Sequence, residues 1–211
     1  MRRLTYFAAA LAVAAGIPAI VAAPAAAQAA ASASGAAATR YVDDLSARVF
    51  TVLKDKSLSR NALRGKFRGM LRENFAVDDI GNRLIRRYRS QITPAQYAAY
   101  QAALPEFAIN AYADRLAEYA NADVQPVRTL PRGSKGDVDV YSRIVVPGKG
   151  QPFDAIWTVR PTAGSFKILN LTVAGINLSL TQEADFSAYI AKNGFDALVA
   201  FMKSANAKAA V

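Results

Sequence analysis

The sequence predicts an α+β fold, in which a curved antiparallel four-stranded sheet has helices packed on one face. Between residues 40 and 120 apolar side chains recur with the helical period of 3.6, and from residue 123 the period changes to 2. Helical patterns return after Gly175. Since only short turns separate the strands, they pair as hairpins and not through crossover helices. A chain of 211 residues suits one domain of ordinary size, which we place at residues 39–205.

Two helices are expected before residue 76. The first carries an apolar stripe at four-residue spacing and ends at the polar segment 54–59. Ser59 is placed to cap the second helix, whose buried stripe continues to Phe75. The stripe of the first helix consists of Tyr41, Leu45, Val49 and Leu53.

Two further helices are expected to begin near Asp78 and after Thr93. Thr93 supplies an N-cap, Pro94 occupies the first helical position, and Gln96 reaches back to the cap, so three start signals coincide. Pro105 lies inside the apolar pattern that follows, and it should kink this helix or split it in two.

The strands follow as alternating apolar and polar side chains bounded by turns that contain proline and glycine. Pro126 makes the first strand an edge strand, because proline cannot donate a hydrogen bond to a neighbour. We expect strands at 123–130, 137–146, 153–159 and 166–173, followed by helices at 183–193 and 195–204.

The N-terminal segment has the composition of a secretory signal peptide, which we place at residues 1–27. Two arginines precede an apolar run, and small residues stand at 25–27, where cleavage occurs. The alternative is a membrane anchor, which Pro18 and Pro24 disfavour. Residues 28–38, rich in alanine and serine, are expected to form a disordered lead-in. The mature chain would then be soluble with a net charge of +8, and export without cysteine indicates a bacterial periplasm.

The composition excludes most familiar catalytic chemistry. The chain contains no cysteine and no histidine, so disulfides, thiol nucleophiles and Ser-His-Asp triads are impossible. Acidic pairs are the remaining candidates for acid–base catalysis, but a solvated strand edge or a helix N-terminus explains them more simply. We therefore expect no catalytic residue, no metal, no cofactor and no enzymatic activity. The pairs are Asp43/Asp44, Asp78/Asp79 and Asp137/Asp139.

A row of arginines lies on one face of the second expected helix, because its members are four residues apart. A solvated helix face explains the row, and so does docking onto an acidic protein or an anionic membrane surface. Nucleic acid is a third partner class, against which the export signal argues. The row consists of Arg60, Arg64, Arg68 and Arg72.

An aromatic stripe follows the helix that begins after Thr93. Such a stripe is core in most proteins, but tyrosine also suits an apolar wall beside a wet opening, because each buried hydroxyl needs a partner. Its members are Tyr97, Tyr100, Phe107, Tyr112 and Tyr119.

Five motifs in the right order over residues 75–202 resemble the MlaC family (toluene tolerance, auxiliary transport) of periplasmic phospholipid-binding proteins. They are 75–77, Tyr88 with 93–96, 112–116, 166–168 with 173–178, and the set Phe186, Ile190, Gly194 and Leu198. The chain departs from the family pattern at Ala76, Arg86, Arg89, Asn170 and Glu183. These departures are similar to the hopanoid-associated HpnM branch, which makes a hopanoid or other polycyclic lipid an alternative cargo.

The resemblance implies a periplasmic shuttle that holds phospholipid acyl chains in an apolar pocket between the sheet and the helices. It also implies exchange with the lipid-binding subunit of an inner-membrane ABC transporter and with an outer-membrane lipoprotein complex, as in systems that maintain lipid asymmetry of the outer membrane. Two other classes remain open, an enzyme with Asp139 or Tyr141 pointing inward, and an adaptor that binds an acidic protein through its basic helix.

We assign the lipid-binding residues from the expected inner face of the sheet and the facing helices, with ordinary core as the alternative for each. The floor is Val138, Val140, Ile144, Ala155, Trp157, Val159 and Ile168. The roof is Ile80, Leu84, Tyr88, Tyr97, Tyr100, Leu104, Phe107 and Tyr112, with the tyrosine hydroxyls near the mouth.

Overall fold

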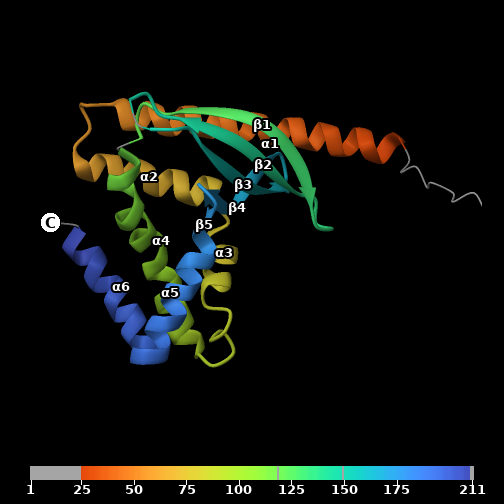
Figure 1. Ribbon diagram of the computed structural model, residues 1–211. Helices are drawn as coiled ribbons and strands as arrows, with labels where there is room; N and C mark the ends of the chain where they lie inside the picture. Colours follow the sequence, from red (N-terminus) through yellow and green to blue (C-terminus); the bar gives the residue numbers. More distant parts are fainter. Residues whose placement is uncertain (1–24, 118, 149, 210–211) are drawn as a thin grey trace, which may run out of the picture.

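The computed structural model describes residues 25–117, 119–148 and 150–209 (Figure 1). Helices come first, a block of strands follows, and two helices end the described chain, as the sequence predicts. The elements are α1 (Ala25–Lys54), α2 (Arg60–Asn74), α3 (Val77–Leu84), α4 (Pro94–Ala117), β1 (Asp123–Arg132), β2 (Asp137–Val145), β3 (Phe153–Thr162), β4 (Ser165–Val173), β5 (Ile176–Asn177), α5 (Leu178–Asn193) and α6 (Phe195–Ala209).

The strands form one antiparallel sheet in the order β1-β2-β3-β4-β5. The α+β fold with an antiparallel sheet is therefore confirmed, and β1 is an edge strand as predicted. The number of strands was wrong, because the described sheet has five and not four. The fifth, β5, contains two residues that pair with Thr172 and Val173, and two residues are too few to show an alternating pattern.

The sequence-encoded ends of the helices are present in the structure. The Ser59 side chain accepts a hydrogen bond from the backbone N–H of Ala62 at 3.2 Å and caps α2. Thr93 and Gln96 form the reciprocal capping box of α4, with bonds of 2.9 and 3.2 Å. α4 continues through Pro105 as one helix, so the proline does not split it.

The start of α1 differs from our prediction. Residues 28–38, expected as a disordered lead-in, belong to this 30-residue helix. Ala38 is fully buried against the sheet, and an added Cβ on Gly35 would lie 2.5 Å from the Thr129 hydroxyl of β1. Small side chains therefore let α1 lie close to the sheet, and this contact orders a segment whose composition alone suggests disorder. The predicted signal peptide lies outside the described residues, except for its last three.

Figure 1 shows two parts, the sheet with α1 and α2 above, and the helices α3 to α6 below. The lower part has its own apolar core, which includes Leu84 of α3, Tyr100 of α4, Phe186 of α5 and Met202 of α6. α4 joins the parts, because its residue Ile109 packs instead with Leu53 and Phe67 of α1 and α2.

Candidate functional site

Most of the predicted pocket floor lies directly beneath α1. Val138, Val140, Val159 and Ile168 are 4% exposed or less, and they pack against α1 in one cluster. The α1 side chains in the same cluster are Ala38, Tyr41, Val42, Leu45 and Val49. These floor residues therefore form the packed core of the helix–sheet interface.

The other end of the same sheet face is covered differently. Ile144 and Ala155 are buried there, with Ala122 and Val146 beside them, and Phe50 is the α1 residue in this cluster. Trp157 contacts both clusters and marks the boundary between them. Three partly buried side chains, Val124, Phe153 and Leu171, complete this apolar end.

The predicted roof lies elsewhere. Leu84, Tyr100 and Leu104 are buried in the core of the lower helices, and Ile80, Tyr88, Tyr97 and Phe107 pack against the same core. Tyr112 is half-buried on α4. The structure therefore gathers the floor and the roof into separate clusters, since α5 and α6 pack against the roof residues.

The tyrosine hydroxyls of the roof have partners within the protein. Tyr100 donates to the Gly81 carbonyl at 3.0 Å, Tyr88 donates to the Ser187 carbonyl at 3.2 Å, and Tyr97 accepts from Gln101 at 2.6 Å. Burial raises the pKa of Tyr100 far above its usual range, as expected for a phenol held in a dry core. Hydrogen bonds to the backbone and to Gln101 thus meet the needs of these hydroxyls inside the core.

Two polar atoms on the inner face of the sheet have no hydrogen-bond partner in the described part of the chain. They are Ser142 Oγ and Trp157 Nε1. Ser142 is 1% exposed and pairs with Ala155, and Trp157 lies two residues further along the same face of β3. A buried donor without a partner costs about 1–3 kcal/mol, so such atoms mark places where a water or ligand is accommodated. Ser142 is not among the residues assigned from the sequence, although a serine at an apolar position of an alternating strand is a visible signal.

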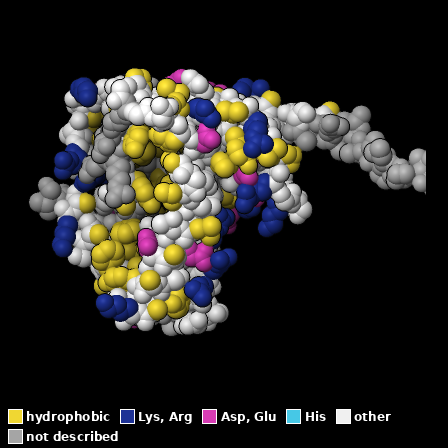
Figure 2. All heavy atoms as spheres, viewed as in Figure 1, with side chains coloured by type: hydrophobic (Ala, Val, Ile, Leu, Met, Phe, Trp, Pro, Cys, Tyr) yellow, Lys and Arg dark blue, Asp and Glu magenta, His cyan; other side chains and the backbone are white. Residues whose placement is uncertain are grey.

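Figure 2 shows a hollow ringed by hydrophobic side chains in the middle of the face displayed. It lies at the height where α2, the upper end of α4 and β5 come together in Figure 1. Tyr119, 37% exposed, contacts the Phe153 ring edge-on at 6.2 Å between ring centroids. Phe153 is one of the partly buried side chains at the end of the sheet that Phe50 covers.

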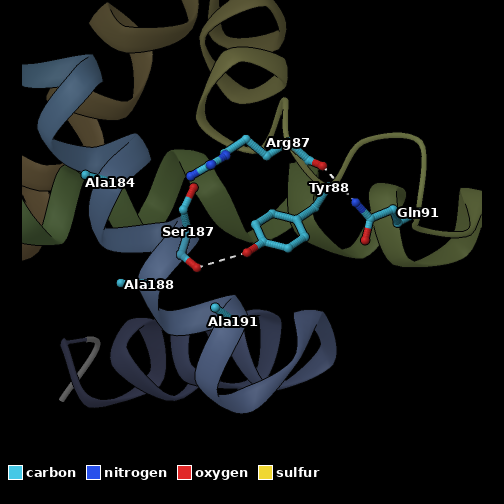
Figure 3. A pocket seen from close by; sticks show the side chains of 7 residues that line it. All are labelled: Arg87, Tyr88, Gln91, Ala184, Ser187, Ala188 and Ala191. Carbon is cyan, nitrogen blue, oxygen red and sulfur yellow. Dashed lines mark hydrogen bonds between the residues drawn. The ribbon is translucent and has the colours of Figure 1, made fainter.

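A second, open groove runs between α5 and the turn that follows α3 (Figure 3). It has a volume of about 610 Å³, and the hydrogen bond from Tyr88 to the Ser187 carbonyl crosses it. Ala184, Ala188 and Ala191 of α5 also line it. Of the predicted lipid-binding residues, Tyr88 alone is among those lining the groove.

Three members of the acidic pairs, Asp79, Asp137 and Asp139, accept hydrogen bonds from arginines. Asp139 is 7% exposed and accepts hydrogen bonds from Arg132 and from the Thr158 hydroxyl, both at 2.7 Å. Arg160 donates two hydrogen bonds to Asp137 and a third to Asp79. Asp137 and Asp139 therefore pair across strands on the outer face of the sheet, and Arg160 links that face to Asp79 of α3.

The arginine row of α2 is divided between the interior and the surface. Arg64 is buried and donates a hydrogen bond to the Ala209 carbonyl of α6, and Arg68 pairs with Glu106 of α4 at 2.6 Å. Arg60 and Arg72 are exposed. The row thus does not form one free surface, because two members hold α2 against other helices.

Searched for a possible membrane span, the described residues contain no helix that combines the necessary length and hydrophobicity.

Two comparisons with known proteins bear on the identity of the chain. Over residues 43–204 the sequence matches the family described as MlaC protein. The chain is also similar to the phospholipid-binding protein from Ralstonia solanacearum, which was solved in complex with a phospholipid. The two share 26% sequence identity at a TM-score of 0.64, over 84% of this chain and 99% of that chain. With a family match over most of its length and an α+β fold shared with that structure, this chain belongs to the MlaC family.

Proposed function

We propose that this protein is a periplasmic phospholipid carrier. The observation that carries the proposal is the similarity to the Ralstonia solanacearum protein, which covers 99% of that chain and was solved with a phospholipid bound. The cargo needs such a protein for a simple reason. At about 0.8 kcal/mol per buried CH₂, two acyl chains left in water would cost roughly 20 kcal/mol, so passage through an aqueous compartment requires an apolar cavity.

The acyl chains occupy the apolar end of the inner sheet face, between Ile144, Ala155 and Leu171. Support comes from the different cover of the two ends of that face. At the other end several α1 side chains pack against the sheet, whereas Phe50 is the one described α1 residue in the cluster at this end. Further support comes from Ser142 Oγ and Trp157 Nε1, which are buried donors without a partner at the inner limit of this end. The ester oxygens of a phospholipid accept hydrogen bonds and suit such donors.

In this proposal the roof residues assigned from the sequence do not line the cavity. They form the core of the lower helices, which lie next to it. Phe107 contacts Phe201 of α6, which is 45% exposed. α4 carries both this contact and Ile109, so a movement of α4 would change the lower helices and the cavity together. Release then follows when a membrane complex deforms the cavity. The partners we propose are the lipid-binding subunit of an inner-membrane ABC transporter and an outer-membrane lipoprotein complex.

The test uses a filling substitution with a matched control. Ala155→Phe places a ring in the proposed cavity, and Ile156→Phe adds a ring on the opposite face of the same strand. Purified after export, the Ala155→Phe protein should lose most of its bound phospholipid, measured as lipid phosphorus per chain, while Ile156→Phe retains it.

Stability separates a cavity from packed core in this test. Inserting a ring into a filled core costs about 1–3 kcal/mol, whereas a ring that enters an empty cavity costs little. Urea unfolding of the delipidated proteins should therefore give similar free energies for both variants. An Ala155→Phe protein that keeps its lipid, or that loses stability to this extent without lipid, contradicts the proposed site.

A further inference from the structure

A small pocket of about 240 Å³ lies on the outer face of the sheet, away from the proposed cargo site. Arg132 of β1, Arg160 of β3 and Asn170 of β4 line it from the sheet. Arg83 from α3 and Ser179 from the first turn of α5 line it from the helices. Asp137 of β2 and Asn177 of β5 also line it, so residues of seven elements surround one polar pocket on the face opposite α1.

The arginines of this pocket differ in how fully they are paired. Arg132 pairs with Asp139 at 2.7 Å, and Arg160 pairs with Asp137 at 2.7 Å and with Asp79 at 3.1 Å. Arg83 forms no ion pair among the described residues, and it donates a long hydrogen bond of 3.4 Å to the Leu169 carbonyl. Its charge is therefore available to an anion in the pocket.

The N-terminus of α5 adds to this positive potential. The helix is 16 residues long, and its N-cap Asn177 accepts one hydrogen bond, from the Leu180 N–H at 3.0 Å. The first turn of a helix carries several N–H groups without partners in the helix and favours negative charge beside it. Asn177, Ser179 and Leu180 all line the pocket, so this helix end opens into it.

An independent observation is the buried amide of Asn170. This residue is 8% exposed, lines the pocket, and its Oδ1 has no hydrogen-bond partner in the described part of the chain. Thr158 stands opposite it on β3, but the Thr158 hydroxyl donates to Asp139. The Asn170 carbonyl oxygen thus lacks a donor, which a hydroxyl or ammonium group of a ligand would supply.

The rim of the pocket is apolar and exposed. Leu180 lines the pocket and is 54% exposed, and Ile176 of the adjoining β5 is 57% exposed. Exposed large apolar side chains beside a basic pocket match a bilayer surface, where the anionic headgroup meets the acyl region.

We propose that this pocket docks the protein onto a bilayer by binding the headgroup of an anionic phospholipid. Arg83 and the N-terminus of α5 hold the phosphate, Asn170 accepts a hydrogen bond from a headgroup hydroxyl, and Ile176 and Leu180 enter the interface. This docking goes beyond carriage of a cargo lipid, since it uses the opposite face of the sheet and a lipid that stays in its membrane.

Vesicle flotation tests the proposal with the exported full-length protein. The probes are vesicles of phosphatidylcholine and matched vesicles that also contain phosphatidylglycerol. Arg83→Gln should weaken binding to the phosphatidylglycerol vesicles roughly fivefold, as expected for a basic group worth about 1 kcal/mol at an anionic surface. Arg72→Gln, which removes the same charge from the exposed face of α2, should weaken it less.

Two further measurements identify the source of the phosphate and guard against misfolding. Leu180→Ser should also weaken vesicle binding, because the apolar rim contributes, and inorganic phosphate at the concentration of the lipid headgroups should not compete. Equal losses for Arg83→Gln and Arg72→Gln, or full binding by Leu180→Ser with competition by phosphate, would overturn the proposal. Bound lipid phosphorus should be unchanged in all three variants, which separates a failure of docking from a failure of the cargo site.

Discussion

Among the described residues, several of the buried polar atoms without a hydrogen-bond partner lie on α1 and on the sheet beneath it. Asp43 Oδ1 and Ser46 Oγ lie on α1, while Ser142 Oγ and Trp157 Nε1 lie on the inner face of the sheet. Each such atom costs about 1–3 kcal/mol when nothing bonds to it. In the cargo site that we propose, Ser142 Oγ and Trp157 Nε1 are the atoms of this set that offer a polar contact to a lipid.

The partly buried carboxyl of Asp43 should make the stability of the protein depend on pH. Burial first, and the neighbouring Asp44 second, raise the pKa of its carboxyl above the usual value. A raised pKa in the folded state means that the fold favours the protonated form. The stabilisation is complete below the unfolded pKa and is lost as pH rises through the folded pKa. At neutral pH the charged carboxylate therefore destabilises the protein.

Asp43→Asn should accordingly raise the free energy of unfolding at about pH 7 by roughly 1 kcal/mol, because it removes a poorly solvated charge. The gain should shrink at about pH 3.5, where the wild-type carboxyl is protonated. Urea unfolding at the two pH values measures both effects. Asp185→Asn, at an exposed position of α5, removes the same charge and should change neither value; a gain that is equal at both pH values would contradict this account of Asp43.

The sequence identifies residue roles where a local pattern sets them. The caps at Ser59 and Thr93 follow from spacing alone, because their partners lie three residues away. By contrast, Tyr100 bonds to Gly81 and Asp139 bonds to Thr158, each 19 residues away, and a single sequence gives no sign of these contacts. From the sequence, the tyrosine stripe is therefore compatible both with ordinary core and with a pocket wall.

At the scale of the elements, α1 is the largest difference between expectation and structure. The segment 28–38 has the alanine-rich composition of a lead-in, yet it continues α1 over the sheet. Its small side chains give no amphipathic stripe, and the reason for its order lies in a close approach to Thr129 across the interface. Only the tertiary contact distinguishes this segment from a disordered one.

Ala38→Arg should therefore destabilise the protein by about 3 kcal/mol, since it places a charge at a fully buried contact between α1 and the sheet. Ala36→Arg, at an exposed position of the same helix, should stay within about 0.5 kcal/mol of the wild type. Thermal and urea unfolding of both variants provide the measurement. Equal stability of the two would mean that residues 28–38 do not pack in solution.

The α2 arginines show the same limit of sequence reasoning for helix surfaces. Four-residue spacing places the row on one side of the helix, as the sequence predicts. It does not tell which members another helix will cover, and here Arg64 contacts the end of α6 and Arg68 pairs with α4. The members that remain for an external partner are Arg60 and Arg72.

For the whole molecule, the sequence predicts the fold class. It does not predict how the sheet with α1 and α2 is arranged relative to the helices α3 to α6. Period and turns gave the order of helices and strands, and these follow from local physics. We expected the roof residues to face the floor residues across a pocket. Instead α5 and α6 cover the roof residues through Phe186, Phe195 and Leu198, and the sequence alone does not give the positions of these two helices. Long-range packing of this kind leaves no periodic trace in the sequence.

The two sites that we propose lie on opposite faces of one sheet. The inner face holds α1 and the proposed cargo site, and the outer face holds arginine–aspartate pairs and the proposed headgroup pocket. A carrier built in this way could meet a membrane with one face while the other shields the acyl chains from water.

Native mass spectrometry of the exported protein, followed by lipid extraction of the same sample, tests the central claim most directly. We expect a bound mass that extraction identifies as a phospholipid, lost in Ala155→Phe and retained in Ile156→Phe. A protein without bound lipid that also takes up none from phospholipid vesicles would contradict the claim, and so would a polycyclic triterpenoid as the sole bound lipid.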